Sequence, residues 1–403
     1  MKVAFLFNHD QTHQVAHALP IALALRARHT DMAVTVITTN DRLSDAVRGI
    51  SRRAGDPIEP VQIGLRRWST RLASRCLDAV LPISKVGIYR DNLDIFGTFD
   101  ALVVAEKTSL LLKTRYGMDA LTIIHTRHGA GDRAIGFNKA SAGFDHVLVS
   151  GEKIRQRLIR EAGLPAARLS TVGYPKFDLM PPSATRLPFA DPAKPTVLYN
   201  PHPSPHLSSW YRHGRDVLDF FLHNDGYNLI FAPHVMLFHR RFVVTIDKLR
   251  LDRPGRIDRR YWEAPNIHID LGSAASTDMT YTAAADIYLG DASSQVYEFL
   301  RRPRPCLFLN SHGHAHDGDA NFAHWQAGQV IGDPADLGHA LRRAVQMQPF
   351  MAPIQQELFA RSVELTDERS SDRAARAVRA ALRMAPASAR PSAMPVQDAL
   401  ATA

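Results

Sequence analysis

The sequence of 403 residues has only two cysteines, Cys76 and Cys306, so it contains neither a disulfide framework nor a zinc-binding cysteine pattern. It also lacks any apolar run near the ~20 residues that span a bilayer. The N-terminal apolar stretch is interrupted at His9, which predicts a first strand and not a signal peptide. These absences favour a cytoplasmic protein. Peripheral attachment to the inner face of the plasma membrane stays open.

A nucleic-acid-binding signature is missing as well, although the chain is basic. The formal net charge is +9, and the excess arginine is spread along the chain. Such a charge suits phosphate-rich ligands, nucleic acid and anionic membrane surfaces alike. No zinc finger, aromatic-rich basic strand or basic arm favours nucleic acid, so we predict no nucleic-acid partner.

Apolar strands alternate with helical segments, which predicts an α/β fold with doubly wound, parallel sheets. In the first half we expect a helix at residues 15–27 and strands at residues 2–8, 33–38, 99–105, 120–125, 145–150 and 169–173. In the second half we expect strands at 196–200, 228–232, 266–271, 286–289 and 306–310, with helices near 209–223, 237–251, 277–284, 294–301 and 334–346. No Gly-x-Gly-x-x-Gly fingerprint follows the first strand, so dinucleotide binding is not expected there.

A proline-rich segment at residues 180–195 separates the two halves. We therefore predict two Rossmann-like domains that face a cleft, an N-terminal acceptor domain at 1–185 and a C-terminal donor domain at 186–384 that includes the C-terminal helices. Residues 385–403 have the composition of a disordered tail. Ligands of such sheets bind beyond the carboxyl ends of the strands.

The strand at 286–289 is followed by Asp291, Ser293 and Ser294, with Glu298 about one helical turn later. A helix that begins on these serines would offer free backbone N–H groups and a positive dipole end to a phosphate. An ordinary capped helix is the alternative.

Histidines follow other strands. His128, between Arg127 and Gly129, could act as a general base, with Asp132 close by in sequence; an incidental surface turn is the alternative. His202 and His234 are held by adjacent prolines, which suits a phosphate or ribose contact, although each taken singly could be structural.

In their order along the chain, these motifs resemble the CDP-glycerol glycerophosphotransferase family, whose catalytic region has a GT-B glycosyltransferase architecture. The matching residues are His128-Gly129, Tyr199-Asn200-Pro201, Pro233-His234, Asp291-Ala292-Ser293-Ser294 and Arg302-Pro303, with Gly173-Tyr174-Pro175 resembling the segment before the hinge. The sequence departs from the family at Ala130, His202 and Ala292, where Thr, Thr and Tyr are usual.

The resemblance implies a transferase of cell-envelope polysaccharide synthesis. It would move glycerophosphate, or a related polyol phosphate, from a CDP-activated donor to a glycan or lipid-linked hydroxyl. We expect catalysis from His128 and Asp132; donor-phosphate contacts from Gly129, His234, Asp291, Ser293 and Ser294; and cleft contacts from His9, Tyr174, Asn200, His202 and Glu298. No cofactor and no metal are implied. Two alternatives remain: a GT-B glycosyltransferase that uses a nucleotide sugar, and a non-catalytic protein that binds a nucleotide or glycan.

Two further stretches attract attention. The histidine-rich loop at 312–324 could contact ligand, bind a metal or do neither, and a ligand-contacting loop is preferred because no companion metal-ligand pattern occurs. Residues 65–80 form a candidate basic amphipathic helix, which could contact an anionic membrane or be an ordinary helix with a solvated basic face.

Overall fold

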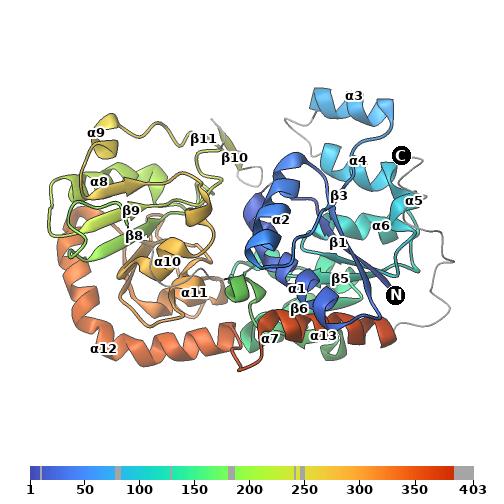
Figure 1. Ribbon diagram of the computed structural model, residues 1–403. Helices are drawn as coiled ribbons and strands as arrows, with labels where there is room; N and C mark the ends of the chain where they lie inside the picture. The colour runs from blue at the N-terminus through green and yellow to red at the C-terminus, as the bar shows by residue number, and fades with distance from the viewer. Residues whose placement is uncertain are drawn as a thin grey trace. The chain divides into compact units, whose positions relative to one another are not determined.

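The computed structural model describes residues 1–9, 11–77, 83–127, 129–179, 187–239, 242–245 and 250–384 (Figure 1). Its internal contacts divide the chain into two units. Unit 1 comprises Met1–Gly129, Phe137–Leu179 and Val363–Ala403, and unit 2 comprises Ala130–Gly136 and Met180–Ser362. Among the described residues, no helix combines the length and the apolar character needed to cross a membrane.

Unit 1 is built on a parallel sheet with the strand order β3-β2-β1-β4-β5-β6-β7. The strands are β1 (Lys2–Phe7), β2 (Ala33–Thr38), β3 (Val61–Gln62), β4 (Ala101–Val104), β5 (Thr122–Thr126), β6 (His146–Val149) and β7 (Leu169–Thr171). Alternate residues of β1 enter two separate cores, Phe5 on one face and Leu6 on the other. Both faces of the sheet are therefore buried, as the continuous apolar runs predict.

Helices cover both faces of the unit 1 sheet and complete its two cores (Figure 1). The core that contains Phe5 is covered by α1 (Val15–Arg28), α2 (Asp41–Arg53) and α13 (Ser370–Met384). The opposite core is covered by α4 (Ile83–Asp91), α5 (Leu93–Phe96), α6 (Leu111–Thr114) and α7 (Glu152–Ala162). A further helix, α3 (Trp68–Leu77), packs beside α4.

Unit 2 contains a second parallel sheet, with the order β12-β9-β8-β13-β14-β15. Its strands are β8 (Thr196–Asn200), β9 (Asn228–Phe231), β12 (Ile267–Ile269), β13 (Ile287–Gly290), β14 (Cys306–Leu309) and β15 (Gln329–Ile331). Its helices are α8 (Trp210–Leu222), α9 (Arg259–Trp262), α10 (Thr280–Ala284), α11 (Val296–Phe299) and α12 (Leu337–Ser362). The expected pair of doubly wound α/β domains is confirmed.

The prediction of a helix at 237–251 is wrong. In its place lie β10 (Val243–Thr245) and β11 (Arg250–Asp252), which pair antiparallel. The apolar spacing there fits a helix, but Val243, Val244 and Thr245 are β-branched and favour an extended chain.

The division into units differs from the expected one at two places. Residues 130–136 belong to unit 2, although they lie between two strands of unit 1. The C-terminal helix α13 belongs to unit 1, where Ala374, Val378 and Leu382 are buried in the same core as Val15 of α1. An amphipathic helix joins whichever core accepts its apolar face, and sequence position alone does not determine that choice. The tail expected at 385–403 lies outside the described residues.

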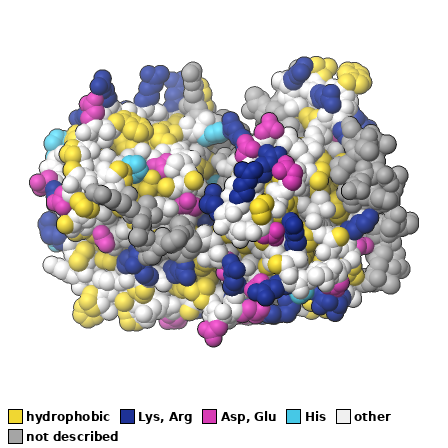
Figure 2. Space-filling view, viewed as in Figure 1, with side chains coloured by type: hydrophobic (Ala, Val, Ile, Leu, Met, Phe, Trp, Pro, Cys, Tyr) yellow, Lys and Arg dark blue, Asp and Glu magenta, His cyan; other side chains and the backbone are white. Residues whose placement is uncertain are grey.

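Basic side chains are dispersed, as the sequence indicates. On the face drawn in Figure 2, lysines and arginines are interspersed with acidic side chains and do not gather into one block. Although the net charge is +9, the basic side chains thus do not form a continuous basic surface on this face.

Candidate functional site

The candidate site of unit 2 lies at the carboxyl ends of β8, β9 and β13. β8 pairs with β9 on one side and with β13 on the other. From β8 the chain first adds β9 and β12 on one side and then β13, β14 and β15 on the other, so β8 and β13 flank the topological switch point of the sheet. Such a switch point is where doubly wound sheets bind ligands. Asn200 ends β8, and its side-chain Nδ2 donates to the carbonyl of Ala232 at 2.7 Å, which ties the ends of β8 and β9 together.

The segment 130–136 is anchored at this site by Asp132. The buried carboxylate of Asp132 accepts hydrogen bonds from the hydroxyl of Tyr297 at 2.5 Å and from the backbone N–H of His324 at 3.2 Å. Nδ1 of His324 lies 3.1 Å from the same oxygen. The segment also runs close to Ser294, because a Cβ at Gly131 would lie 3.1 Å from the Cβ of Ser294. These contacts hold the segment so that Arg133 lies at the carboxyl end of β8, beside His202.

Two N–H donors, from Arg133 and Ser204, face the His202 ring, which can accept only one of them. Nη1 of Arg133 lies 2.9 Å from Nε2 of His202, while the backbone N–H of Ser204 donates to Nδ1 of His202 at 3.0 Å. Burial, and then the charge of Arg133, hold the pKa of His202 well below its usual value, so the ring is neutral. A neutral imidazole has one N–H and only one accepting nitrogen. Either tautomer therefore leaves two N–H groups facing each other.

His234, after β9, repeats part of this arrangement. Its Nδ1 accepts from the backbone N–H of Met236 at 3.3 Å, which leaves its Nε2 carrying the proton. The ring centroids of His202 and His234 are 6.2 Å apart. Burial and the charge of Arg133 lower the pKa of His234 to about 4, so this ring is neutral as well. The buried imidazole of His202, the half-buried imidazole of His234 and the guanidinium of Arg133 thus concentrate N–H donors at one place.

Asp291 acts as a scaffold beneath these donors. Its fully buried carboxylate accepts from four donors: the N–H groups of His202 and Ala292 on Oδ1, and the N–H and hydroxyl of Ser209 on Oδ2, at 2.7 to 2.9 Å. Burial raises the pKa of Asp291 to about 6, although these donors favour the ionised form. The carboxylate is fully used in holding the loops after β8 and β13, so its support of a phosphate would be indirect.

The helix expected at 294–301 is reduced to one turn. α11 has only four residues, its N-cap is Gln295, and no side chain caps it. Ser293 is buried and its hydroxyl accepts from the N–H of Gln295 at 3.3 Å, Ser294 is exposed, and Glu298 is buried within α11. Pro303 follows closely and cannot continue a helix. A single turn carries only a small dipole. The positive charge at these strand ends therefore comes from Arg133, because the rings of His202 and His234 are neutral.

The other predicted site residues lie in unit 1. His9 follows β1, with its Nδ1 3.0 Å from Oε1 of Glu106. Tyr174 packs against His17 and Phe177, with ring centroids 5.4 and 4.7 Å apart, and belongs to the core contacts of α13. Gly129 has φ 92°, a conformation that favours glycine. His128 lies outside the described residues.

The histidine-rich loop is held to the chain after β8 by backbone contacts. Nε2 of His312 lies 3.0 Å from the carbonyl of Ser208, and Nε2 of His314 lies 2.9 Å from the carbonyl of His206. His324, at its end, contacts Asp132. The described residues contain no group of three or more His, Cys, Asp and Glu arranged to hold a metal ion. The loop thus fastens the segment before α8, which also carries Ser209.

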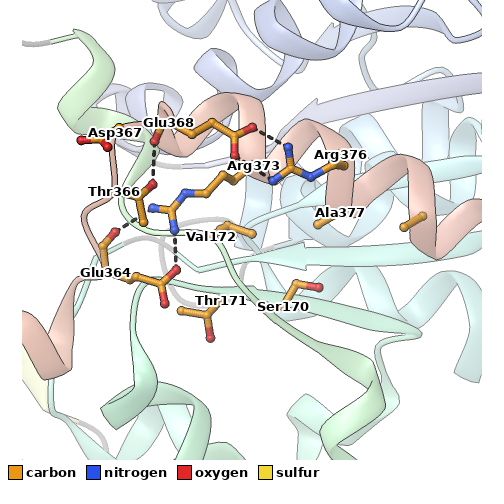
Figure 3. A pocket seen from close by; sticks show the side chains of 11 residues that line it. Ser170, Thr171, Val172, Glu364, Thr366, Asp367, Glu368, Arg373, Arg376 and Ala377 are labelled. Carbon is orange, nitrogen blue, oxygen red and sulfur yellow. Dashed lines mark hydrogen bonds and ion pairs between the residues drawn. The ribbon is translucent and has the colours of Figure 1, made fainter.

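An open hollow of about 770 Å³ in unit 1 contains none of the predicted site residues. It lies between β7 and the start of α13 (Figure 3). Arg373 contacts Glu364, and Arg376 contacts Glu368 at 2.8 Å, so both guanidiniums are paired with carboxylates of the same hollow. Paired charges of this kind give little net attraction to an anion.

Sequence reasoning missed three charged residues, Arg133, Glu106 and Lys85. Glu106 comes two residues after the end of β4. The rule that directs attention to polar residues after strands would have identified it. Lys85 lies on a helix, and Arg133 is four residues beyond the Gly129 turn, so neither carries a local signal.

Comparison of the sequence with protein-family models and with curated proteins found no match. The fold, in contrast, is similar to solved structures. A variant of the wall teichoic acid polymerase TagF with CDPG is 13% identical, with a TM-score of 0.57 over 95% of this chain and 89% of that chain. UDP-GlcNAc 2-epimerase from Neisseria meningitidis bound to UDP-GlcNAc is 12% identical, with a TM-score of 0.57 over 96% and 100%. The S. aureus MnaA–UDP structure is 11% identical, with a TM-score of 0.54 over 98% and 99%. At these identities the likeness shows the fold, which is GT-B-like.

Proposed function

We propose that the chain is a transferase that takes its donor from a nucleoside diphosphate conjugate, with CDP-glycerol as the expected donor. One observation carries the proposal: the excess of N–H donors where Arg133 meets His202, beside His234. An oxyanion placed there would accept from both facing N–H groups and remove their conflict. The switch point of a doubly wound sheet suits a nucleotide diphosphate.

The transferred group is inferred from the motif resemblance, and the TagF structure with CDPG, which has a similar fold, is consistent with it. An acceptor hydroxyl would attack the β-phosphorus of CDP-glycerol. The new bond joins that phosphorus to the acceptor oxygen, the bond to the bridging oxygen breaks, and CMP leaves with the electron pair. Arg133 and the Nε2–H groups would stabilise the charge that develops on the leaving phosphate. The acceptor would be a glycan or lipid-linked hydroxyl of the cell envelope.

Two of the expected residues receive adjusted roles in this proposal. Asp132 would position Arg133, because its carboxylate is buried against Tyr297 and His324. His128 remains a candidate base through the family resemblance. Neither role requires a metal or a covalent intermediate.

A nucleotide sugar is the second candidate donor. It is favoured by the similarity of the fold to proteins solved with UDP-GlcNAc and UDP. The same cluster of N–H donors would bind the diphosphate of a UDP-sugar, with bond cleavage at a sugar carbon instead of phosphorus. A non-catalytic nucleotide-binding protein would use the cluster without turnover.

Membrane contact is supported by α3. Trp68 and Leu72 are 77% and 54% exposed, and basic side chains flank them at Arg67 and Arg71. Such a face suits an anionic lipid surface, where a lipid-linked acceptor would be found. Sedimentation with vesicles that contain anionic lipid tests this, with Trp68→Ser as the variant.

The decisive experiment measures binding and products together. Calorimetry with CDP, UDP, CDP-glycerol and UDP-GlcNAc gives the preferred nucleotide. Arg133→Gln should weaken the preferred ligand about 10- to 100-fold, because a charge-assisted hydrogen bond contributes roughly 1.5–3 kcal/mol. Arg259→Gln is the matched control, since that side chain is 89% exposed on α9 and pairs with Glu263. Unchanged affinity in Arg133→Gln would refute the phosphate site.

Product analysis then separates the candidates. Release of CMP from CDP-glycerol with an acceptor supports glycerophosphate transfer. Release of UDP, or conversion of the sugar, supports the second candidate. Binding without any product supports the non-catalytic alternative.

A further inference from the structure

The carboxyl ends of β4 and β5, which are neighbours in the sheet of unit 1, each lead into a basic side chain. Arg127 directly follows β5, and Lys107 comes shortly after the end of β4. Ligands of doubly wound sheets bind beyond this edge. Phe137, Asn138 and Arg157, which contact these two residues or one another, also belong to unit 1. The whole cluster therefore lies within one unit.

The buried ring of Phe137 lies against two guanidinium groups. The Cζ atom of Arg127 is 4.5 Å from the ring centroid, and that of Arg157 is 3.9 Å from the same centroid. The negative face of an aromatic ring attracts a cation, so Phe137 holds both arginines close to each other. Arg157 comes from α7, where its Nε and Nη2 donate to the carboxylate of Glu161 at 2.6 and 3.0 Å. The ring and α7 thus position the guanidinium of Arg127.

The cations of this cluster disfavour one another's charge. Burial, and then the charge of Arg157, lower the pKa of Arg127 to about 10. Burial, and then the charge of Arg127, lower the pKa of Lys107 to about 8. A bound anion would favour the protonated form of each group, because an opposite charge stabilises the charged state. The electrostatic environment therefore favours an anion as the ligand.

Two carboxylates next to the cluster are engaged by other groups. Glu106 precedes Lys107 in the sequence, but its oxygens lie 3.0 Å from Nδ1 of His9 and 3.1 Å from Nζ of Lys85. The other carboxylate, Glu161, already accepts two hydrogen bonds from one arginine of α7. Burial and positive charge are thus the causes that act on the pKa of Lys107.

Asn138 adds a neutral donor to the cluster. Nζ of Lys107 donates to Oδ1 of Asn138 at 2.7 Å, and this contact determines which end of the amide is the oxygen. Nδ2 of Asn138, at the other end, carries two N–H groups. Asn138 is exposed, and Lys107 and Arg127 are half-buried, so a ligand can reach all three side chains. An ammonium, a guanidinium and an amide are donors that proteins offer to the oxygens of a phosphate.

We infer that Lys107, Arg127 and Asn138 form an oxyanion site of unit 1 that binds a phosphate group. The phosphate oxygens accept from Nζ of Lys107, the guanidinium of Arg127 and Nδ2 of Asn138, while Phe137 and Arg157 position the guanidinium. The inference uses residues of unit 1 alone and does not depend on the proposed transferase function. The phosphate is either free or esterified to an organic group, and the charged oxygens that the site binds are the same in both cases.

Labelling of Lys107 tests the site directly, because it reports on this one side chain. The full chain is treated with an amine-acylating reagent at about pH 8, where about half of Lys107 is the reactive free amine. Inorganic phosphate should raise the pKa of Lys107 and slow its acylation about fivefold, measured by mass spectrometry. Potassium chloride at equal ionic strength should not. Lys113 is the internal control: its Nζ already contacts Asp145 at 2.6 Å, and phosphate should leave its acylation unchanged.

Two variants extend this test. Arg127→Gln removes one of the two causes that lower the pKa of Lys107, so this pKa should rise and the protection by phosphate should disappear. Arg155→Gln is the matched control, because Arg155 lies on α7 and contacts Glu152 at 3.5 Å. Asn138→Asp keeps an oxygen for Lys107 at an exposed position and repels phosphate, so it tests the site even where Arg127→Gln does not fold.

Calorimetry with inorganic phosphate adds the affinity. It is measured in an Arg133→Gln background, which removes the phosphate site proposed for unit 2. Asn138→Asp in this background should bind phosphate about tenfold more weakly.

Protection of Lys107 that is lost in Arg127→Gln and Asn138→Asp and kept in Arg155→Gln supports the site. Glycerol 3-phosphate, assayed beside inorganic phosphate, distinguishes the sources: the compound that protects at the lower concentration is the better ligand, and equal protection fits both. Acylation of Lys107 that neither compound slows, or that potassium chloride slows equally, would overturn the inference. The readout is independent of turnover, so a chain that is inactive on every donor but protected at Lys107 refutes the transferase and leaves this site standing.

Discussion

Nη1 of Arg133 lies 2.9 Å from Nε2 of His202, across 69 positions of the sequence. The guanidinium reaches this point because Gly131 allows a close approach to Ser294 and Asp132 anchors the segment in unit 2. The pairing sets a cation against a neutral ring that already accepts a backbone N–H. A phosphate oxygen is the simplest group that would satisfy both donors.

This relationship makes the titration of His234 a sensitive probe. Burial lowers its pKa first and Arg133 lowers it further, to about 4. Replacing Arg133 by Gln removes one of the two lowering causes, so the pKa should rise above this value. A nuclear magnetic resonance titration of the His234 ring measures it, with Arg259→Gln as the control. A pKa that does not move in Arg133→Gln would show that the guanidinium acts elsewhere.

Asp291→Asn should destabilise unit 2. Each carboxylate oxygen accepts two donors, so an amide nitrogen at either position faces at least one backbone N–H. A buried unsatisfied donor costs roughly 1–3 kcal/mol. Chemical denaturation should show this loss. Asp333→Asn is the control, because the exposed Asp333 side chain accepts from the backbone N–H of Ala335 as an N-cap, a role that asparagine fills equally well. Wild-type stability in Asp291→Asn would contradict the scaffold role.

Gly173→Ala should weaken the attachment of α13. Gly173 has φ 80°, and an added Cβ would lie under 3.0 Å from the Arg373 guanidinium, the Ser370 hydroxyl and the Glu364 carbonyl. Gly163→Ala is the matched control: its φ is 71°, but nothing lies within 4 Å of the added Cβ. Backbone strain alone costs on the order of 1 kcal/mol, and overpacking adds about 1–3 kcal/mol. Equal melting temperatures for the two variants would argue against close packing at Gly173.

Glu106 should make the free energy of unfolding of unit 1 decrease at acidic pH. Its folded pKa of about 2 lies below the ordinary value of 4.5, so its stabilisation is fully present above pH 4.5 and is lost as the pH falls toward 2. Near neutral pH, Glu106→Gln should lower the free energy of unfolding by on the order of 2 kcal/mol. Denaturation of both proteins between pH 7 and pH 3 measures the difference. A gap that stays constant across this range would disagree with the assigned contacts.

The sequence by itself determined the class of fold and the central strands of both sheets, because buried parallel strands are short, continuous and apolar, and turn residues end them. It did not predict the short edge strands β3 and β15. It located Asn200, His202, His234 and Asp291, since polar residues after such strands fall at one edge of the sheet. The sequence prediction failed at 237–251, where the local pattern was ambiguous. The apolar spacing there fits a helix, but the β-branched residues favour strands, and the structure contains the paired strands β10 and β11.

Only the tertiary structure decided which distant groups meet. It brought Arg133 to His202, paired His9 with Glu106 and Lys85, and gave α13 to the core of unit 1. Hydrogen bonds and ion pairs act over a few ångströms in space and leave no mark at fixed sequence spacing. Their partners are determined by chain topology, because a buried group pairs with whatever the packing of both sheets places beside it.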